Sequence, residues 1–325
     1  MRQGSLYTLM FHGIVSSKPD HFLYGPNTNC FVREKDFEKL IRYCSKKYRV
    51  LKLKDLASYL NGTATEDGVL ITFDDGLQSL YTLGLPILKK YNATATVFIT
   101  SDWTNKGIQP AVFSLEYLLY HHLPATVNIY SDGFIYEKRV DTKENISPSI
   151  DAIWAKLFEN KISPLSLTDQ QITINSKPLN LFEAEPGGGY WKPVSWEILQ
   201  QAVKEGTIEI GAHGKTHTPF AWLSKEQLEN ELNENKEVIE KKLQANVTSC
   251  SFPHGSYDAN TLSILPEYFT YGFANKMVST QNKIEKLNIT RYNVPFQRPN
   301  NIPLLIGYPF LGKVLRKFGS VTGLF

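Results

Sequence analysis

Short apolar runs alternate with amphipathic segments along most of this chain, and this alternation limits the folds that it can adopt. Residues 5–14, 68–73 and 93–100 have the length and composition of buried strands. Residues 33–48 and 224–243 place apolar side chains at helical spacing. Because strands and helices that alternate in this way form a mostly parallel sheet covered by helices, the sequence predicts an α/β fold.

The alternation has one interruption, and one predicted helix has a well-marked start. From about residue 101 to residue 189 the pattern loosens, and residues 121–140 have the pattern of a β-hairpin, so we interpret 101–189 as an insertion. Residues 49–56 are predicted to be a strand that returns into the sheet. Ser224 and Gln227 have the spacing of a capping box, which predicts a helix that begins directly after Ser224.

The composition is that of a soluble globular protein. Of the 325 residues, 42% are hydrophobic and 21% are charged, and the formal net charge is +3. A charge this small gives no argument for a nucleic-acid partner. The three cysteines have no C-x-x-C spacing, which fits a reducing compartment. Because no apolar run has the length of a signal peptide or a membrane span, we expect a cytoplasmic protein.

Two adjacent acids end one of the apolar runs. Asp74, Asp75 and Gly76 directly follow the run at 68–73. A strand that ends in a turn is one interpretation, since Asp and Gly are common turn residues. The other is a functional site, because burying two neighbouring carboxylates costs free energy unless a cation, a proton or hydrogen bonds compensate.

Two histidines, His213 and His217, follow another predicted strand. On one helical turn these positions would share a face, although a chance pair is the alternative in a chain with seven histidines. Both the acids and the histidines lie at the C-terminal ends of strands, where barrel and open-sheet enzymes assemble their sites. One carboxylate and two imidazoles leave a fourth position open, as in catalytic zinc sites, and the second carboxylate would then be a general base.

A third segment, residues 249–258, contains Pro253 and Gly255 and is predicted to form a rigid turn. A backbone N–H in such a turn could help to hold an oxyanion, and an ordinary turn is the alternative.

Taken in order, the stretches TFDDG, HGKTH and FPHGSYD resemble the motifs of the polysaccharide deacetylase family, carbohydrate esterase family 4, also known as the NodB-homology domain. The resemblance covers residues 11–294. It implies a distorted (β/α)7-type barrel with an inserted subregion, with a catalytic domain at 1–300 and a separate tail at 301–325. It also implies metal-dependent hydrolysis of N- or O-acetyl groups on a carbohydrate, with Zn²⁺ as the first choice of ion and Co²⁺, Ni²⁺ or Fe²⁺ as alternatives.

The resemblance assigns a role to each motif residue. Asp74 is expected to be the general base, and the expected metal ligands are Asp75, His213 and His217. The backbone N–H of His254, the residue before the glycine of the third motif, is expected to assist the ion as an oxyanion hole.

The chain departs from the family pattern at three places. Gly214 stands where the family often has Ser or Thr, and Ser251 stands where many members have an arginine that pairs with the base. Arg291 lies in a segment that resembles the closing R-x-x-V-P stretch of some members, and we expect it to replace that arginine. The late Leu-x-x-His motif is missing. Residues 9–14 resemble the N-terminal strand of circularly rearranged members, so His12 is expected to be the general acid.

The substrate is less constrained than the chemistry. Tyr190, Trp191 and Trp196 could stack on sugar rings, although packing in the core is the alternative for at least one tryptophan. Residues 301–325 are either a packed helix or a basic amphipathic segment that rests on a membrane, which would suit a lipid-linked sugar. Other hypotheses are a sugar-binding member without catalysis and a deformylase or amidase that acts on another amide.

Overall fold

A computed structural model describes residues 3–16, 30–107, 111–131, 133–168, 170–178, 192–275 and 285–294, and the account below is of these residues. Its main feature is a parallel sheet with the spatial order β14-β13-β12-β11-β6-β5-β1-β15, with β4 paired to β5. The strands are β1 (Leu6–Phe11), β4 (Arg49–Val50), β5 (Gly68–Phe73), β6 (Ala95–Ile99), β11 (Ile208–Ala212), β12 (Ser249–Ser251), β13 (Tyr271–Ala274), β14 (Ile289–Thr290) and β15 (Tyr292–Asn293).

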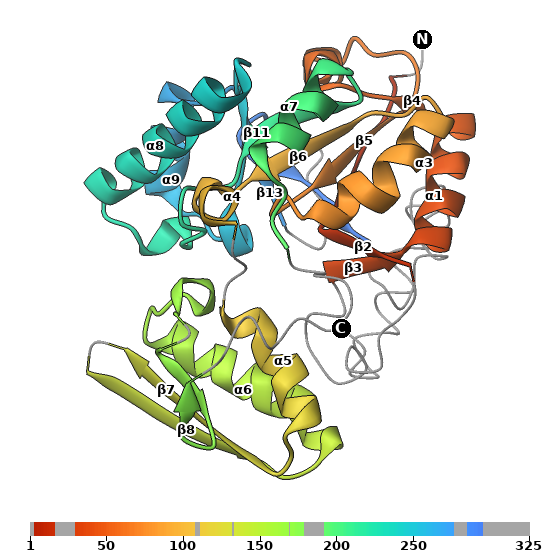
Figure 1. Cartoon of the computed structure of the whole chain (residues 1–325). Coiled ribbons are helices and arrows are strands. Elements are labelled where there is room, and N and C mark those ends of the chain that lie inside the picture. The colour runs from red at the N-terminus through yellow and green to blue at the C-terminus, as the bar shows by residue number, and fades with distance from the viewer. Residues whose placement is uncertain are drawn as a thin grey trace.

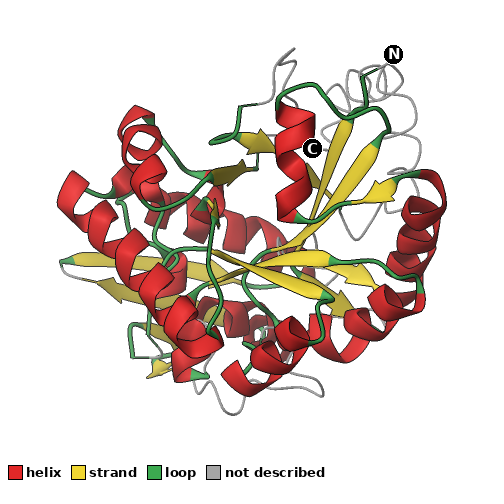
Figure 2. Cartoon of the chain, turned by 90° about the horizontal axis from the view of Figure 1, so that it is seen from above, coloured by secondary structure: helices red, strands yellow, loops and turns green. Residues whose placement is uncertain are grey.

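The sheet nearly closes on itself, and a single residue lies at the seam. β14 pairs with β13 at one edge, and β15 pairs with β1 at the other edge. Only Arg291 separates β14 from β15, so one short segment reaches both edges. Helices surround the strands on the outside (Figure 2). The expected α/β fold, a distorted (β/α) barrel, is confirmed.

Helices and short turns connect the strands (Figure 1). The helices of the barrel are α1 (Glu34–Lys47), α2 (Leu56–Leu60), α3 (Leu85–Lys90), α4 (Ser101–Lys106), α7 (Trp196–Lys204), α8 (Lys225–Leu243) and α9 (Ala259–Ile264). Single 3-10 turns lie at Leu53–Asp55, Phe220–Trp222, Pro253–Gly255 and Leu265–Glu267, and a π-helical turn lies at Leu80–Gly84. A separate pair of short parallel strands consists of β2 (Gly13–Val15) and β3 (Phe31–Arg33).

Two local predictions have different outcomes. The capping box at the start of α8 is confirmed, because Ser224 Oγ accepts from Gln227 N at 3.3 Å and Gln227 Oε1 accepts from Ser224 N at 2.9 Å. The predicted strand at 49–56 is wrong beyond Val50. Side-chain acceptors take the N–H groups that a strand would use, since Lys52 N donates to Asp55 and Leu53 N donates to Glu209.

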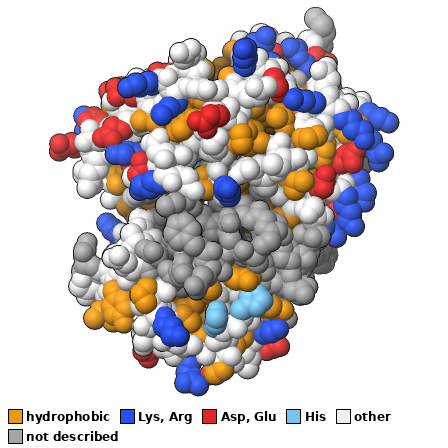
Figure 3. Space-filling view, in the orientation of Figure 1, with side chains coloured by type: hydrophobic (Ala, Val, Ile, Leu, Met, Phe, Trp, Pro, Cys, Tyr) orange, Lys and Arg blue, Asp and Glu red, His pale blue; other side chains and the backbone are white. Residues whose placement is uncertain are grey.

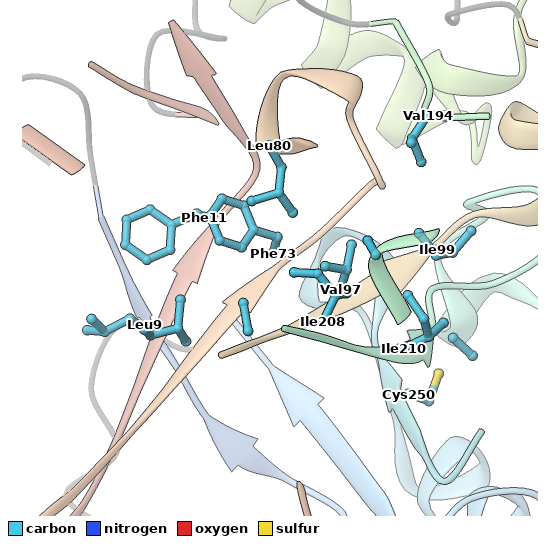
Figure 4. Packing of buried hydrophobic residues seen from close by; sticks show 14 of the residues in the cluster. Leu9, Phe11, Phe73, Leu80, Val97, Ile99, Val194, Ile208, Ile210 and Cys250 are labelled. Carbon is cyan, nitrogen blue, oxygen red and sulfur yellow. The ribbon is translucent and has the colours of Figure 1, made fainter. Parts of the chain in front are cut away.

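The barrel has a continuous apolar core (Figure 4). All six residues of β5 are buried, as expected for a strand covered on both faces. Phe11 and Phe73, on neighbouring strands, stack with ring centroids 5.0 Å apart, and Phe37 of α1 packs edge-on against Phe11 at 5.3 Å. This packing fixes the end of β5, from which the two acids follow.

The insertion is a subdomain with a hydrophobic core of its own. It contains α5 (Ala111–His121), β7 (Ala125–Ser131), β8 (Phe134–Val140), α6 (Ile146–Glu159), β9 (Ile172–Ile174) and β10 (Lys177–Pro178), with 3-10 turns at Lys143–Asn145 and Pro164–Ser166. β7 and β8 form the predicted hairpin in an antiparallel sheet of order β10-β9-β7-β8. In Figure 1 this subdomain lies below the barrel.

Two surface properties bear on the sequence predictions. On the face shown in Figure 3, basic and acidic side chains are interspersed, which agrees with the small net charge. Within the described ranges, each helix is too short or too polar to cross a bilayer. The tail at 301–325, for which the alternatives were a packed helix and a segment that rests on a membrane, lies outside the described residues.

Candidate functional site

The two acids stand where β5 ends, and the backbone turns them toward different partners. Asp74 N donates to Phe11 O at 2.9 Å, which continues the ladder between β1 and β5 by one residue. Asp75 then has a φ of 71°, in the left-handed region that non-glycine residues rarely adopt, and Gly76 follows with a φ of 68°. Both side chains are buried, at 1% and 4% exposure. Two carboxylates so placed need compensating charge.

Asp75 faces the two histidines. Its Oδ1 lies 3.5 Å from His213 Nε2 and 3.3 Å from His217 Nε2. The histidines do not converge on a helical turn, so the helical argument for their spacing is wrong. His213 follows β11, and the loop after it reverses through Gly214, with a φ of 75°, and His217, with a φ of 65°. This left-handed backbone brings both imidazoles to one carboxylate.

These three groups fit a divalent cation. Ligands about 2.0–2.1 Å from zinc in a tetrahedral site are about 3.3 Å from one another, close to both measured separations. Contacts of this length are too long to be good hydrogen bonds, and the buried Oδ1 of Asp75 has no hydrogen-bond partner among the described residues. All three ligand atoms lie within 4.8 Å of one another. A cation between them would satisfy the carboxylate oxygen.

Neighbouring groups orient both imidazoles. His213 Nδ1 lies 2.9 Å from the carbonyl oxygen of Ser251, so Nδ1–H donates there and Nε2 presents its lone pair to the site. Trp103 of α4 stacks on His217 with ring centroids 5.0 Å apart. Burial acts to raise the pKa of Asp75, but the contacts with both histidines hold that pKa well below its ordinary value.

Asp74 is paired with Arg291 across the barrel. Arg291 Nη1 donates to Oδ1 at 2.6 Å and Nη2 donates to Oδ2 at 2.7 Å, so the pair is bidentate. Arg291 is 1% exposed. Burial acts to raise the pKa of Asp74, but the charges of Arg291 and His213 and the hydrogen bonds from Arg291 bring it below its ordinary value. The carboxylate is therefore ionised at neutral pH.

Ser251 connects this pair to the third motif. Its hydroxyl accepts from Arg291 Nη2 at 2.8 Å and donates to Asp74 Oδ2 at 3.3 Å. Arg291 also donates to Asn275 Oδ1 and lies over the ring of Phe98. The Arg291 guanidinium therefore lies beside Ser251, the position at which many members of the family that this sequence resembles have their motif arginine.

His12 and His254 lie at the border of this cluster. His12 directly follows β1 and lies close enough to Asp74 and Asp75 to contribute to lowering the pKa of both carboxyl groups. Its Nδ1 is shielded from solvent and has no hydrogen-bond partner within the described part of the chain. His254 has a φ of 55°, and its ring packs edge-on against His217 at 4.6 Å. The structure therefore brings all seven predicted site residues into one region.

Sequence reasoning missed several residues that support the site. Glu231 of α8 is buried and accepts from Thr216 N at 2.7 Å and from Thr216 Oγ1 at 2.9 Å, which holds the histidine loop. Its place on the apolar face of α8, between Leu228 and Leu232, was a usable signal. Asn275 directly follows β13, so the strand-end rule would have found it. For Trp103 the sequence gives no comparable signal.

The aromatic residues proposed to stack on sugars have separate outcomes. Tyr190 and Trp191 lie outside the described residues. Trp196 is 8% exposed, and its indole N–H donates to Asn105 Oδ1 at 3.0 Å. Trp196 is therefore packed in the core, as the alternative interpretation predicted.

Comparisons with known proteins agree with this geometry. The family model described as polysaccharide deacetylase matches residues 61–270, more than half of the chain. No curated protein matches the sequence significantly.

Solved structures show the same fold at low sequence identity. The Streptococcus pyogenes deacetylase PplD, determined in complex with acetate, is 16% identical and has a TM-score of 0.60, with 93% of this chain and 98% of that chain covered. IcaB from Ammonifex degensii is 14% identical with a TM-score of 0.57, covering 94% and 97%. A de-N-acetylase from Aggregatibacter actinomycetemcomitans is 14% identical with a TM-score of 0.52, covering 89% and 94%.

Proposed function

This chain belongs to the polysaccharide deacetylase family, and on that premise we propose that it hydrolyses N- or O-acetyl groups of a carbohydrate with the help of a divalent ion. The observation that carries the proposal is the division of the adjacent acids between two sets of partners. Asp75 faces His213 and His217, and Asp74 faces Arg291. This division supports a cation at Asp75 and the acceptance of a proton by Asp74.

Asp75, His213 and His217 would hold the ion, preferably Zn²⁺, with Co²⁺, Ni²⁺ or Fe²⁺ as alternatives. A divalent ion there would act as a Lewis acid toward water and toward the acyl carbonyl group. The donor set of one carboxylate and two imidazoles is that of catalytic zinc sites and leaves room for substrate. The hydrogen bond from His213 Nδ1 to Ser251 keeps Nε2 available as a ligand atom.

Asp74 would accept a proton from the attacking water. The bidentate pair with Arg291 fixes the plane of its carboxylate and keeps it ionised, and Ser251 holds one of its oxygens. A general base needs both a fixed geometry and the correct protonation state.

His12 and His254 would complete the reaction. His12 would protonate the departing nitrogen or oxygen. A histidine suits this role because imidazolium is a competent acid near neutral pH. Its position beside both acids, after β1, supports this assignment. The backbone N–H of His254 would donate to the developing oxyanion.

The test is acetate release from an acetylated chitooligosaccharide, together with metal analysis. Asp74→Asn should lower kcat by at least about 100-fold with metal content near normal, whereas His213→Ala should lose the ion. Asp141→Asn and His122→Ala, at exposed positions, are the matched controls. Full activity in either site variant would contradict the assignment, and so would wild-type activity that is unaffected by a chelator.

The hypothesis of a sugar-binding member without catalysis rested on the absent motif arginine and the absent late histidine. The bidentate pair of Arg291 with Asp74 supports Arg291 as the replacement of that arginine and counts against the first reason. The same acetate assay separates a catalyst from a binding protein. A formylated sugar as a second substrate tests the deformylase hypothesis.

A further inference from the structure

The inserted subdomain packs against the barrel directly beside the candidate site. Phe158 of α6 lies edge-on to His254, with ring centroids 5.1 Å apart, and Trp154 lies 6.0 Å from the same ring. Phe158 also packs against Trp222 of the barrel at 5.0 Å. A substrate that reaches the cluster around Asp75 therefore meets the end of α6.

A cavity of about 540 Å³ lies where α6 ends. One side of it is Thr218, the residue after His217, and the other side comes from the insertion. Asn160 and Lys161 line it two and three residues after Phe158. One wall directly follows His217, and the other continues from Phe158, which contacts His254. A chain-like substrate held at the candidate site could therefore extend into this cavity.

The lining has the chemistry that recognises a polyhydroxylated ligand. The residues that line the cavity include Ser131, Ser166 and Thr218, which carry hydroxyl groups, together with Asn160 and Phe134. Hydroxyl and amide groups both donate and accept hydrogen bonds, and aromatic rings stack on apolar faces of sugars. Ser163 is only 5% exposed, and its hydroxyl has no hydrogen-bond partner among the described residues.

The described residues of the lining carry charge of one sign. Among the residues that the structure describes, Lys161 is the one charged side chain that lines the cavity. It has a φ of 54°, and its backbone N–H donates to Phe158 O at 3.0 Å, which fixes its place at the end of α6. A lysine ammonium group in an otherwise neutral lining attracts carboxylate or phosphate groups.

We propose that this cavity binds the part of a carbohydrate chain that neighbours the acylated sugar, and that Lys161 binds an anionic substituent on it. The inference rests on the proposed deacetylation and names its substrate class. The substrate is an acidic oligosaccharide or polysaccharide, with a carboxylate or a phosphate group close to the acetyl group, and not a single neutral sugar.

Binding and catalysis are measured separately on the full chain. Isothermal titration uses three oligosaccharides of equal length, one neutral, one with carboxylate groups and one with phosphate groups. Wild-type protein should bind one of the acidic ligands at least about 10-fold more tightly than the neutral one, and Lys161→Ala should remove that difference. The two acidic ligands distinguish a uronate-type from a phosphate-bearing substrate.

Lys156→Ala is the matched control, because Lys156 lies in the last turn of α6 before Lys161, pairs with Glu159 at 2.8 Å and does not line the cavity. Hydrolysis of a small aryl acetate, which is too short to reach the cavity, should be equal in wild type and in both lysine variants.

The outcomes are separable. Equal affinity of wild type for acidic and neutral ligands, or equal behaviour of the Lys161 and Lys156 variants, would overturn the inference and leave the deacetylase proposal intact. Lysine-dependent binding of an acidic ligand by a protein that hydrolyses neither the aryl acetate nor an oligosaccharide would overturn the deacetylase proposal and would leave only a binding site for acidic carbohydrate at Lys161.

Discussion

Replacement of Arg291 by methionine should damage both stability and turnover, because it leaves the Asp74 carboxylate buried without its counter-charge. The substitution removes hydrogen bonds to Asp74 of 2.6 and 2.7 Å and one to Ser251 of 2.8 Å. Among the described residues, the Asp74 carboxylate, at 1% exposure, would keep the hydrogen bond from the Ser251 hydroxyl at 3.3 Å and the more distant His213 at 3.9 Å. Methionine is chosen because it fills much of the volume without charge.

The expected cost is about 3–5 kcal/mol in the free energy of unfolding, the usual penalty for removing one partner of a buried ion pair. Because whole proteins have only about 5–15 kcal/mol of stability, the loss should be obvious in urea denaturation. The double variant Arg291→Met with Asp74→Asn removes the stranded charge, so it should regain about 2 kcal/mol or more relative to the single variant.

Turnover gives the second readout. Acetate release by the Arg291→Met variant should fall by about 100-fold or more, because Asp74, the proposed general base, loses the group that orients it. Moving the arginine, with Ser251→Arg and Arg291→Ser together, should restore part of that loss, since Ser251 already contacts both Asp74 and Arg291. A single variant within about 1 kcal/mol of wild type, or a double variant no more stable than the single one, would refute this reasoning.

Three further predictions concern the histidine loop. Gly214→Ala should lower the free energy of unfolding, measured by urea denaturation, by about 1–2 kcal/mol. The φ at this position is 75°, and a Cβ there would lie 3.0 Å from Glu231 Oε1. Unchanged stability would contradict this prediction. Burial raises the pKa of Glu231 above 4.5 in the folded state, so folding favours the protonated form. The stability that this protonation contributes should be lost as the pH rises from about 4.5 through the raised pKa. The Glu231→Gln variant should not show that loss when melting temperatures are measured from pH 4.5 to 7. Parallel plots of melting temperature against pH for wild type and variant would refute the prediction. Zn²⁺ at 100-fold above its Kd should raise the free energy of unfolding of wild type by about 2.7 kcal/mol and should leave that of His213→Ala unchanged. An equal effect on both proteins would argue against the assigned ligands.

Periodicity and motif order made most of the architecture predictable. The α/β fold, the hairpin of the insertion and the capping box at Ser224 depend on local patterns that a single sequence displays. The rule that sites form at the C-terminal ends of parallel strands also predicted that Asp74, Asp75 and His213 belong to one site. It would have added Asn275 if it had been applied to every strand.

Backbone conformation was the part that the residue pattern did not contain. Asp75, His217 and His254 all have positive φ values, of 71°, 65° and 55°. Non-glycine residues in this region are strained, and the strain is tolerated where surrounding contacts fix the chain. Spacing alone led to the wrong helical explanation for the histidines, because i and i+4 positions converge on a helix and can also converge in a left-handed loop.

The replacement of the motif arginine depends on the register of the closing strand, which the sequence does not display. Arg291 contacts Asp74 across 217 positions, and the short segment around it has no apolar alternation that would fix its pairing. Its register is set by Ile289 opposite Phe273 at one edge and Tyr292 opposite Leu9 at the other. A slip of one residue would turn the side chain at 291 to the opposite face of the strand. Closure of the barrel at both edges, more than the presence of an arginine in the chain, therefore delivers the guanidinium to Asp74 beside Ser251.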